Sequence, residues 1–236
     1  MRGLFITGTD TGAGKTVLSG CLLAAMAAAG ERAVACKPVV TGLEEAQPGG
    51  EGGWPADDEL LAEITGAART EVSPLRFGPA VSPHLAAELA GTPIDPQALL
   101  ARTRASLDGA SAAIVEGVGG LLVPLAAGYA VRELAVDLAL PLIVAARPGL
   151  GTINHSLLTL EAARAAGLEV RAVVLTPWPA QPGAIERSNR ETIERLGDVA
   201  VATLSELAGP RAQELERAGA ALPWREWLDG EAPPRA

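Results

Sequence analysis

Residues 8–16 form a segment of small side chains that ends in Gly14-Lys15-Thr16. A glycine-rich loop presents backbone N–H groups to an anion, and a lysine at its end adds a positive charge for the β- and γ-phosphates of a nucleotide. The Thr16 hydroxyl is a type of ligand that Mg²⁺ accepts. In the common phosphate-binding pattern a glycine stands where this chain has Thr9, and here the glycine comes one position earlier. We interpret the segment as a phosphate-binding loop, in preference to an ordinary glycine turn.

Other side chains that could take part in the same chemistry come directly after an apolar run or a glycine-rich loop: Lys37, Asp58, Glu116 and Thr176. Because ligands of parallel sheets collect at the carboxyl ends of strands, we expect these side chains to lie near the phosphate-binding loop. Glu116 stands where an acidic ligand of Mg²⁺ is expected opposite such a loop. Taken alone, each assignment is open: Asp58 also suits a helix cap, Lys37 a surface charge and Glu116 a solvated turn.

The segments on either side of the loop predict the elements that hold it in place. Residues 4–6 are apolar and predict a buried strand. From Thr16 an alanine-rich segment predicts a helix, and Gly30 stands where the glycine after a helix belongs. A strand, a glycine loop and a helix in this order are the context in which the motif binds phosphate.

Strand and helix patterns alternate along the rest of the chain. Short apolar runs predict strands at 33–36, 112–115, 141–145, 170–175 and 199–203. Helices are predicted at 59–64 with Asp57-Asp58 as the N-cap, from Pro83, from Pro96 to about Leu107, at 152–166 and at 183–196. This alternation indicates an α/β fold with a mostly parallel β-sheet flanked by helices on both faces. We expect a single domain over 1–229, a mobile surface loop at 42–56 and a disordered tail at 230–236.

Composition narrows the class of protein. The chain has 236 residues, of which 48% are hydrophobic, so it can bury a sizeable core. Its formal net charge of −9 argues against a nucleic-acid partner. Its two cysteines, Cys21 and Cys36, are too few for a disulfide framework and suit buried positions in a reducing compartment. No signal segment or membrane-spanning run is evident, so we expect a cytoplasmic protein.

The motifs, taken together and in order, resemble those of the dethiobiotin synthetases, a family with a P-loop NTPase-like fold. The resemblance spans residues 3 to about 176 and rests on five segments: Gly8–Thr16, Lys37-Pro38-Val39-Val40-Thr41-Gly42, Ser82-Pro83-His84, Val115–Gly120 and Gly151-Thr152-Ile153-Asn154-His155. The early first glycine of the phosphate-binding loop is part of the family pattern.

The resemblance implies an ATP-dependent ligase of biotin biosynthesis. Enzymes of this family close a ureido ring on 7,8-diaminononanoate with CO₂, ATP and Mg²⁺. One amine captures CO₂ as a carbamate, the carbamate attacks the γ-phosphate to give a mixed anhydride, and the second amine then displaces phosphate. The resemblance implies that Lys37, Lys15 and Thr11 act in catalysis. It also implies that Thr16, Asp58 and Glu116 hold Mg²⁺.

The same resemblance implies the binding residues and a homodimer. Nucleotide contacts are expected from Gly12, Ala13, Gly14, Lys15, Thr16, Val17, Glu116, Gly117, Val118, Gly119, Thr176, Pro177, Leu204, Ser205 and Glu206. Substrate contacts are expected from Thr11, Lys37, Thr41, Pro83, Gly151, Thr152, Ile153 and Asn154. In the family the segment 151–154 serves the active site of the partner subunit, where the helix start suits the substrate carboxylate.

The chain departs from the family at two positions. Many members have Glu where this chain has Gly12, and some read the purine with an Asn that aligns with Thr176. A threonine hydroxyl has fewer hydrogen-bonding groups than an amide, so we expect base recognition either to be looser or to rest on the backbone around 204–206.

Other classes of protein use similar loops. The alternatives are a partitioning or positioning ATPase that acts as a switch, a ligase like cobyrinic acid a,c-diamide synthase, and a nucleotide-binding module without turnover. The switch ATPases carry a lysine where this loop has Asp10. The diamide synthase needs a further domain with a nucleophilic cysteine.

Overall fold

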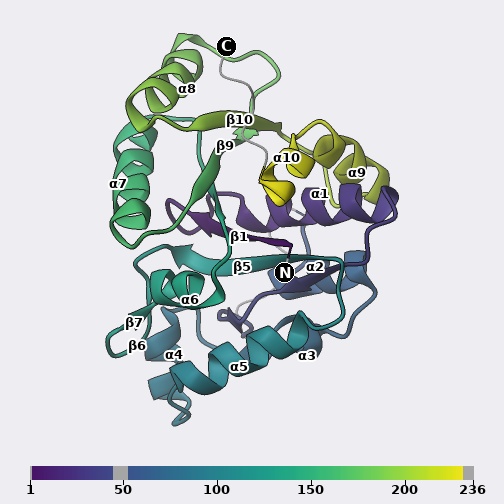
Figure 1. Cartoon of the computed structure of the whole chain (residues 1–236), viewed down its shortest axis with the longest axis vertical. Coiled ribbons are helices and arrows are strands. Elements are labelled where there is room, and N and C mark those ends of the chain that lie inside the picture. Colours follow the sequence, from purple (N-terminus) through teal and green to yellow (C-terminus); the bar gives the residue numbers. More distant parts are fainter. Residues whose placement is uncertain (1, 45–52, 231–236) are drawn as a thin grey trace.

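The computed structural model describes residues 2–44 and 53–230. Its centre is a six-stranded parallel sheet with the strand order β10-β9-β8-β1-β5-β2 (Figure 1). These strands are β1 (Gly3–Gly8), β2 (Ala33–Cys36), β5 (Ala112–Gly120), β8 (Leu142–Ala146), β9 (Val170–Trp178) and β10 (Ala200–Ser205). Two small sheets accompany it: a parallel pair, β3 (Val39–Val40) and β4 (Leu75–Arg76), and an antiparallel pair, β6 (Pro124–Ala126) and β7 (Tyr129–Ala130).

The helices cover both faces of the central sheet. They are α1 (Lys15–Ala28), α2 (Asp57–Thr65), α3 (Arg69–Val72), α4 (Pro83–Leu89), α5 (Pro96–Ser106), α6 (Val131–Leu138), α7 (Thr152–Ala165), α8 (Ala184–Gly197), α9 (Ala212–Ala220) and α10 (Trp224–Asp229). The predicted α/β class, the parallel sheet and the single domain are therefore confirmed. The expected loop at 42–56 lies outside the described residues over 45–52, and the expected tail does so over 231–236.

Successive side chains of β1 point alternately into the two cores on opposite faces of the central sheet. Leu4 and Ile6 point into a core shared with α1, α2, α9 and α10, whereas Phe5 points into a core on the opposite face with α5 and α6. All three side chains are fully buried. The strand that leads into the phosphate-binding loop is thus held from both faces.

Helix α9 packs directly on α1, the helix that follows the phosphate-binding loop (Figure 1). A Cβ atom at Gly219 would lie 1.9 Å from the carbonyl oxygen of Cys21, so only glycine permits this approach. The sequence patterns did not predict α9, nor α6 and α10. Their existence depends on packing against distant parts of the chain.

Two element boundaries differ from the predictions in a way that affects the site. Strand β5 runs to Gly120 instead of ending at 115, so Glu116 lies within the strand. Helix α2 has Ala56 as its N-cap and starts at Asp57, so Asp57 and Asp58 are its first two residues and not the cap.

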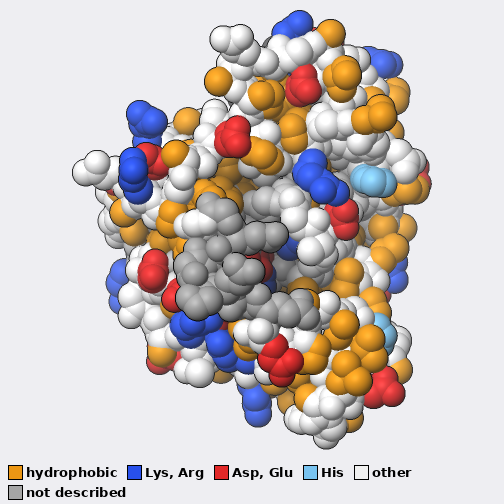
Figure 2. Space-filling model, turned by 180° about the vertical axis from the view of Figure 1, so that it is seen from behind, with side chains coloured by type: hydrophobic (Ala, Val, Ile, Leu, Met, Phe, Trp, Pro, Cys, Tyr) orange, Lys and Arg blue, Asp and Glu red, His pale blue; other side chains and the backbone are white. Residues whose placement is uncertain are grey.

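Several large apolar side chains are exposed. They include Leu85 and Leu89 on α4, Leu158 on α7, and Leu122 and Leu150 in nearby loops. Figure 2 shows hydrophobic side chains gathered around both histidines along one edge of the molecule.

Candidate active site

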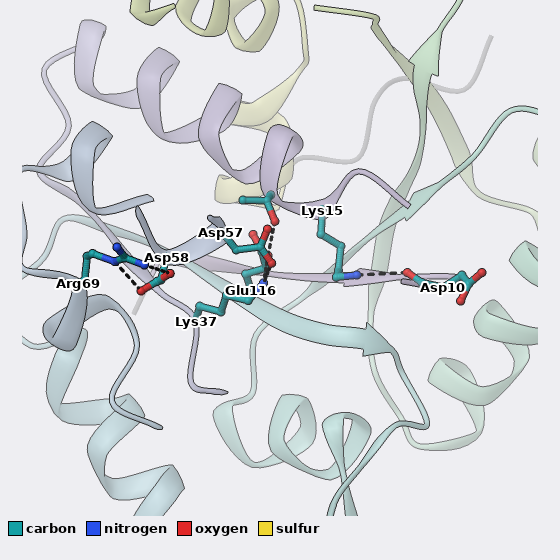
Figure 3. Close-up of polar contacts among 8 residues, drawn as sticks. Asp10, Lys15, Lys37, Asp57, Asp58, Arg69 and Glu116 are labelled. Carbon is teal, nitrogen blue, oxygen red and sulfur yellow. Dashed lines mark hydrogen bonds and ion pairs between the residues drawn. The ribbon is translucent and has the colours of Figure 1, made fainter. Parts of the chain in front are cut away.

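A pocket of about 590 Å³ lies where β1, β2 and β5 approach their carboxyl ends. Its walls are the phosphate-binding loop, Lys37, Asp57, and parts of the segments 80–83 and 118–123. The carboxyl ends of neighbouring parallel strands meet at this edge of the sheet, as predicted. Figure 3 shows the charged side chains that converge here.

The phosphate-binding loop owes its shape to glycines at particular positions. Gly12 and Gly14 have φ angles of 72° and 85°, which favour glycine. A Cβ at Gly8 would lie 2.8 Å from the carbonyl oxygen of Asp10 and 3.1 Å from Nζ of Lys15. The glycine at position 8, one place earlier than in the common pattern, is thus required by the return of the loop over the end of β1.

Lys15 folds back over this loop. Its Nζ donates a hydrogen bond to the carbonyl oxygen of Asp10 at 3.2 Å. Burial lowers the pKa of Lys15, and the positive charge of Lys37 lowers it further. An anion placed in the loop would favour the charged form, so this arrangement is suited to binding phosphate.

Lys37 lies between two carboxylates and is 2% exposed. Its Nζ donates to Oε1 of Glu116 at 2.6 Å and also pairs with the Asp57 carboxylate (Figure 3). Burial alone would lower the pKa of Lys37, but the charges of Asp57 and Glu116 outweigh burial and raise it. The backbone N–H of Lys37 is fixed by the carbonyl of Val72 at 2.8 Å. Lys37 is therefore a fixed positive charge at the wall of the pocket.

Glu116 links Lys37 to the end of the phosphate-binding loop, which carries Lys15. It is 1% exposed, and its Oε1 accepts a hydrogen bond from Oγ1 of Thr16 at 2.8 Å as well as the one from Lys37. Its Oε2 is buried and has no hydrogen-bond partner among residues 2–44 and 53–230. A buried carboxylate oxygen without a partner is unfavourable, and a bound cation would stabilise it. Carboxylate and hydroxyl oxygens are ligands that Mg²⁺ prefers.

Asp57 and not Asp58 belongs to this group, whereas the sequence led us to expect Asp58 here. Asp57 lines the pocket; burial would raise its pKa, but Lys37 and a hydrogen bond with Thr16 lower it. Asp58 is fully buried, where it accepts hydrogen bonds from Arg69 at 2.9 and 3.0 Å and from Arg76. Successive helix residues point about 100° apart, so only one of the two can face the pocket.

The residues expected to bind substrate divide into two groups. Thr11, Thr41 and Pro83 line the pocket, together with Val40 and the segment 80–82, which the sequence did not indicate. The residues 151–154 do not line it. They begin α7, beside a second cavity of about 400 Å³ whose wall includes Thr11, Leu122 and Leu158.

The residues expected to contact the nucleotide also divide. Gly12, Gly14, Lys15, Thr16, Val17, Val118 and Gly119 line the pocket. Ala13 is fully buried, and Gly117 packs beneath the pocket, where a Cβ would meet Val131 at 2.9 Å and Phe5 at 3.1 Å.

The expected base-binding residues lie at the neighbouring ends of β9 and β10. A Cβ at Gly14 would lie 2.6 Å from Cγ2 of Thr176, so Thr176 packs against the phosphate-binding loop. Leu204 is 1% exposed, whereas Pro177, Ser205 and Glu206 are exposed. Pro177, Ser205 and Glu206 can therefore present side-chain atoms to a ligand, whereas Thr176, which is 2% exposed, and Leu204 are largely covered.

The rarity of lysine in the sequence would have strengthened the assignment of Lys37 to the site. The chain contains two lysines, Lys15 and Lys37, and every other basic residue except histidine is arginine. Both lysines are buried in this one site. The ammonium of lysine is a compact point charge, whereas the guanidinium of arginine is larger and fork-shaped, so the two residue types are not interchangeable in such a site.

Two searches of the described residues bear on the class of protein. In that part of the chain no group of three or more His, Cys, Asp or Glu side chains is placed to hold a metal ion. A metal here would thus need the Thr16 hydroxyl or ligand oxygens beside the two carboxylates. Within the same residues no helix has the length and apolar character needed to span a membrane.

Comparisons with known proteins identify relatives of this chain. The family described as "AAA domain" matches residues 2–228. ATP-dependent dethiobiotin synthetase BioD of Mycobacterium avium (strain 104) is 38% identical over 233 residues, which cover 97% of this chain and 98% of that protein. The protein of the same name from Anaeromyxobacter sp. (strain Fw109-5) is 44% identical over 210 residues, which cover 84% of this chain and 91% of that protein.

Solved structures with the same fold are much more distant in sequence. The MinC:MinD cell division protein complex of Aquifex aeolicus matches with a TM-score of 0.58 at 14% identity, covering 100% of this chain and 99% of that chain. The Pyrococcus furiosus cell division ATPase MinD matches with a TM-score of 0.54 at 18% identity, covering 93% and 89%. At such low identity these matches show the shared fold alone.

Proposed function

This chain belongs to the ATP-dependent dethiobiotin synthetase family, and on that basis we propose that it forms the ureido ring of dethiobiotin from 7,8-diaminononanoate, CO₂ and ATP. It is an ATP-dependent ligase of biotin biosynthesis. One observation supports assigning this reaction to particular residues of the pocket. Lys37 is buried at the wall of the phosphate-loop pocket, where Glu116 and Asp57 hold it.

The charges of the pocket suit the anions that this reaction passes through. Lys37 and Lys15 would hold the carbamate formed from one amine and CO₂ next to the γ-phosphate. A carbamate oxygen then forms a bond to the γ-phosphorus while the bond to ADP breaks. The second amine attacks the carbamate carbon, phosphate leaves with the former carbamate oxygen, and the amine proton passes to solvent or phosphate. Because both amines belong to one molecule, ring closure is intramolecular and favourable.

Thr16, Asp57 and Glu116 would hold Mg²⁺, which when bound neutralises charge on the nucleotide phosphates. The unpartnered Oε2 of Glu116 supports this choice of ligands. Asp57 replaces Asp58 in the set because the Asp58 carboxylate is fully occupied by two arginines.

We propose that Thr11, Thr41 and Pro83 contact the reacting end of the diamine. The proposed nucleotide contacts come from the phosphate-binding loop through Val17, from 116–119, and from Thr176, Pro177 and 204–206. Leu204 and Ala13 would contribute backbone groups only, since their side chains are buried in the core.

The working form is proposed to be a homodimer in which residues 151–154 of one subunit bind the substrate carboxylate in the site of the other. Two observations support it. These residues do not line the pocket of their own subunit. The apolar side chains Leu122, Leu150 and Leu158 are 59%, 98% and 55% exposed near α7, which leaves them available for a subunit contact.

Mixing inactive variants tests this dimer. Lys37→Met and Asn154→Ala subunits should each have low activity alone, whereas their mixed dimer keeps one site with both residues intact. Recovery of about a quarter of wild-type activity in a 1:1 mixture is the expected result, and a mixture no more active than its components would contradict shared sites.

The compartment is proposed to be the cytoplasm. The two free cysteines, both buried, suit a reducing environment.

The decisive experiment for the reaction is ADP release with each substrate omitted in turn. ADP release should require both 7,8-diaminononanoate and bicarbonate, and dethiobiotin should form in equal amount. ATP hydrolysis that is indifferent to the diamine would favour a switch ATPase instead. Nucleotide binding without any hydrolysis would favour a module without turnover.

A further inference from the structure

A second charged cluster lies beside the pocket and is not part of it. The Asp58 side chain is fully buried, and its two oxygens accept hydrogen bonds from Arg69 on α3 and Arg76 on β4 (Figure 3 shows the pair with Arg69). The side chains of Arg69 and Arg76 are 39% and 26% exposed. Burying a carboxylate is costly unless its oxygens are paired, so the cluster can persist only while both elements stay in contact with α2.

These pairs connect α2 to the strand pair β3–β4, which contributes another part of the pocket wall. Val40 on β3 pairs with Arg76 on β4, and the N–H of Phe77 donates to the carbonyl of Val40 at 2.9 Å. Val40 and the next residue, Thr41, line the pocket. Asp58 thus joins the helix that carries Asp57 to the strand pair that carries the proposed substrate contacts.

Besides Asp58, the first turn of α2 is held by the pair of Asp57 with Lys37 and by an Arg69–Glu59 ion pair of 3.6 Å. Its N-cap residue is Ala56, which has no side chain to cap the free N–H groups. The buried apolar residues Leu60 and Leu61 come one turn later. Asp57 and Asp58 are adjacent and both acidic, so without the arginines their charges would also repel each other.

We propose that Asp58, with Arg69 and Arg76, is a positioning residue that orients the first turn of α2 so that Asp57 faces Lys37 and the proposed metal site. This inference rests on the proposed function, because Asp57 is assigned there as a metal ligand. Groups that orient a ligand typically change metal affinity by about 10- to 100-fold when removed. Asp58 should therefore affect metal binding although it does not touch the metal.

The test is a calorimetric titration of the full chain with Mg²⁺ in the presence of saturating ADP. Asp58→Asn should weaken Mg²⁺ binding about tenfold while ADP affinity without metal stays unchanged. Arg69→Met keeps the Asp58–Arg76 pair and serves as a second variant if Asp58→Asn does not fold. Glu169→Gln is the matched control, because it removes the remote Glu169–Arg171 ion pair of 2.6 Å.

A double-mutant cycle separates positioning from general stabilisation. If Asp58 acts through Asp57, adding Asp58→Asn to Asp57→Asn should weaken Mg²⁺ binding no further, although the melting temperature falls. Equal Mg²⁺ affinity in wild type, Asp58→Asn and Arg69→Met, with only the melting temperature reduced, would overturn the proposal. A wild-type protein that binds ADP and releases no diamine-dependent ADP would overturn the proposed function itself, and the inference with it.

Discussion

The two halves of the proposed nucleotide site contain different kinds of chemical groups. The half at the ends of β1, β2 and β5 contains the buried charges of Lys15, Lys37 and Glu116. The half at the ends of β9 and β10 contains a buried threonine, the buried Leu204, and the exposed Pro177, Ser205 and Glu206, so its one charge is exposed to solvent. Phosphate, metal and carbamate require charge at fixed positions, whereas a base can be held by packing and backbone groups. We therefore expect the rate of the reaction to depend strongly on single residues of the first half. The preference for one nucleotide base over another should depend only weakly on single residues of the second half.

The strongest test of this contrast is Lys37→Met. Losing a preorganised charge at the reacting atoms should reduce diamine-dependent turnover by roughly 10²–10³-fold. The variant also leaves Asp57 and Glu116 without their shared cation, which should lower stability by about 3–5 kcal/mol. Steady-state ADP release and thermal melting measure the two effects.

ADP should still bind to Lys37→Met, because Lys15 and the loop remain. Arg211→Met, which removes an exposed ion pair with Glu214, is the control and should change both quantities little. A Lys37→Met enzyme with near-normal turnover would show that the buried ammonium is only structural.

The contact between the two halves gives the next largest effect. In Gly14→Ala the new Cβ would lie 2.6 Å from Cγ2 of Thr176, at a residue whose φ is 85°. We expect the Kd for ADP to rise by about 30-fold or more, since backbone strain and the clash each cost at least about 1 kcal/mol. Fluorescence titration measures it.

Adding Thr176→Ser removes Cγ2 and with it the clash, while the strain at residue 14 remains. The double variant should recover only part of the lost affinity. If Thr176→Ser brings no recovery at all, the packing of Thr176 on the loop is unimportant for nucleotide binding.

Nucleotide selectivity tests the second half alone. With the Thr176 hydroxyl, the exposed side chains of Ser205 and Glu206, and backbone groups to read a base, kcat/KM for ATP should exceed that for GTP or CTP by no more than about tenfold, compared with far larger ratios where buried polar groups read a substrate. Thr176→Asn supplies two donors and an acceptor and should increase the preference for ATP. Discrimination of several hundredfold in the wild type would mean that this half reads the base through further polar contacts.

Most elements that carry the site could be predicted from local pattern. The apolar runs before residue 8 and after residue 16 identify β1 and α1, because strand, glycine loop and helix are coded locally. The end of β5 could not be predicted, since Gly117, Gly119 and Gly120 normally interrupt strands. At Gly117 a glycine is needed within the strand, because the Phe5 and Val131 side chains leave no room for a Cβ.

The choice between Asp57 and Asp58 shows where the sequence is insufficient. Two adjacent carboxylates on a helix are equivalent in composition, and a shift of one residue in the helix start exchanges their directions. What decides is the position of Arg69 and Arg76, which lie 11 and 18 residues away from Asp58. Such partners are known only when the chain is folded.

The smallest expected effect contrasts two residues of the charged half, and the chain allows it to be measured directly because Lys15 and Lys37 are its only lysines. The pKa of Lys15 is lowered by burial and by Lys37, whereas that of Lys37 is raised by Asp57 and Glu116. A lowered pKa leaves more neutral amine at a given pH, so at pH 8.5 an amine-reactive ester should modify Lys15 several-fold faster than Lys37. Peptide mass spectrometry measures both rates, with the N-terminal amine as internal reference.

Raising the pH should reduce the difference between the two modification rates, as Lys15 approaches full deprotonation and Lys37 begins to lose its proton. ADP should protect Lys15 because phosphate favours its charged form. Faster modification of Lys37 would mean that its two carboxylate partners do not hold it in solution, and the proposed carbamate site would lose its fixed charge.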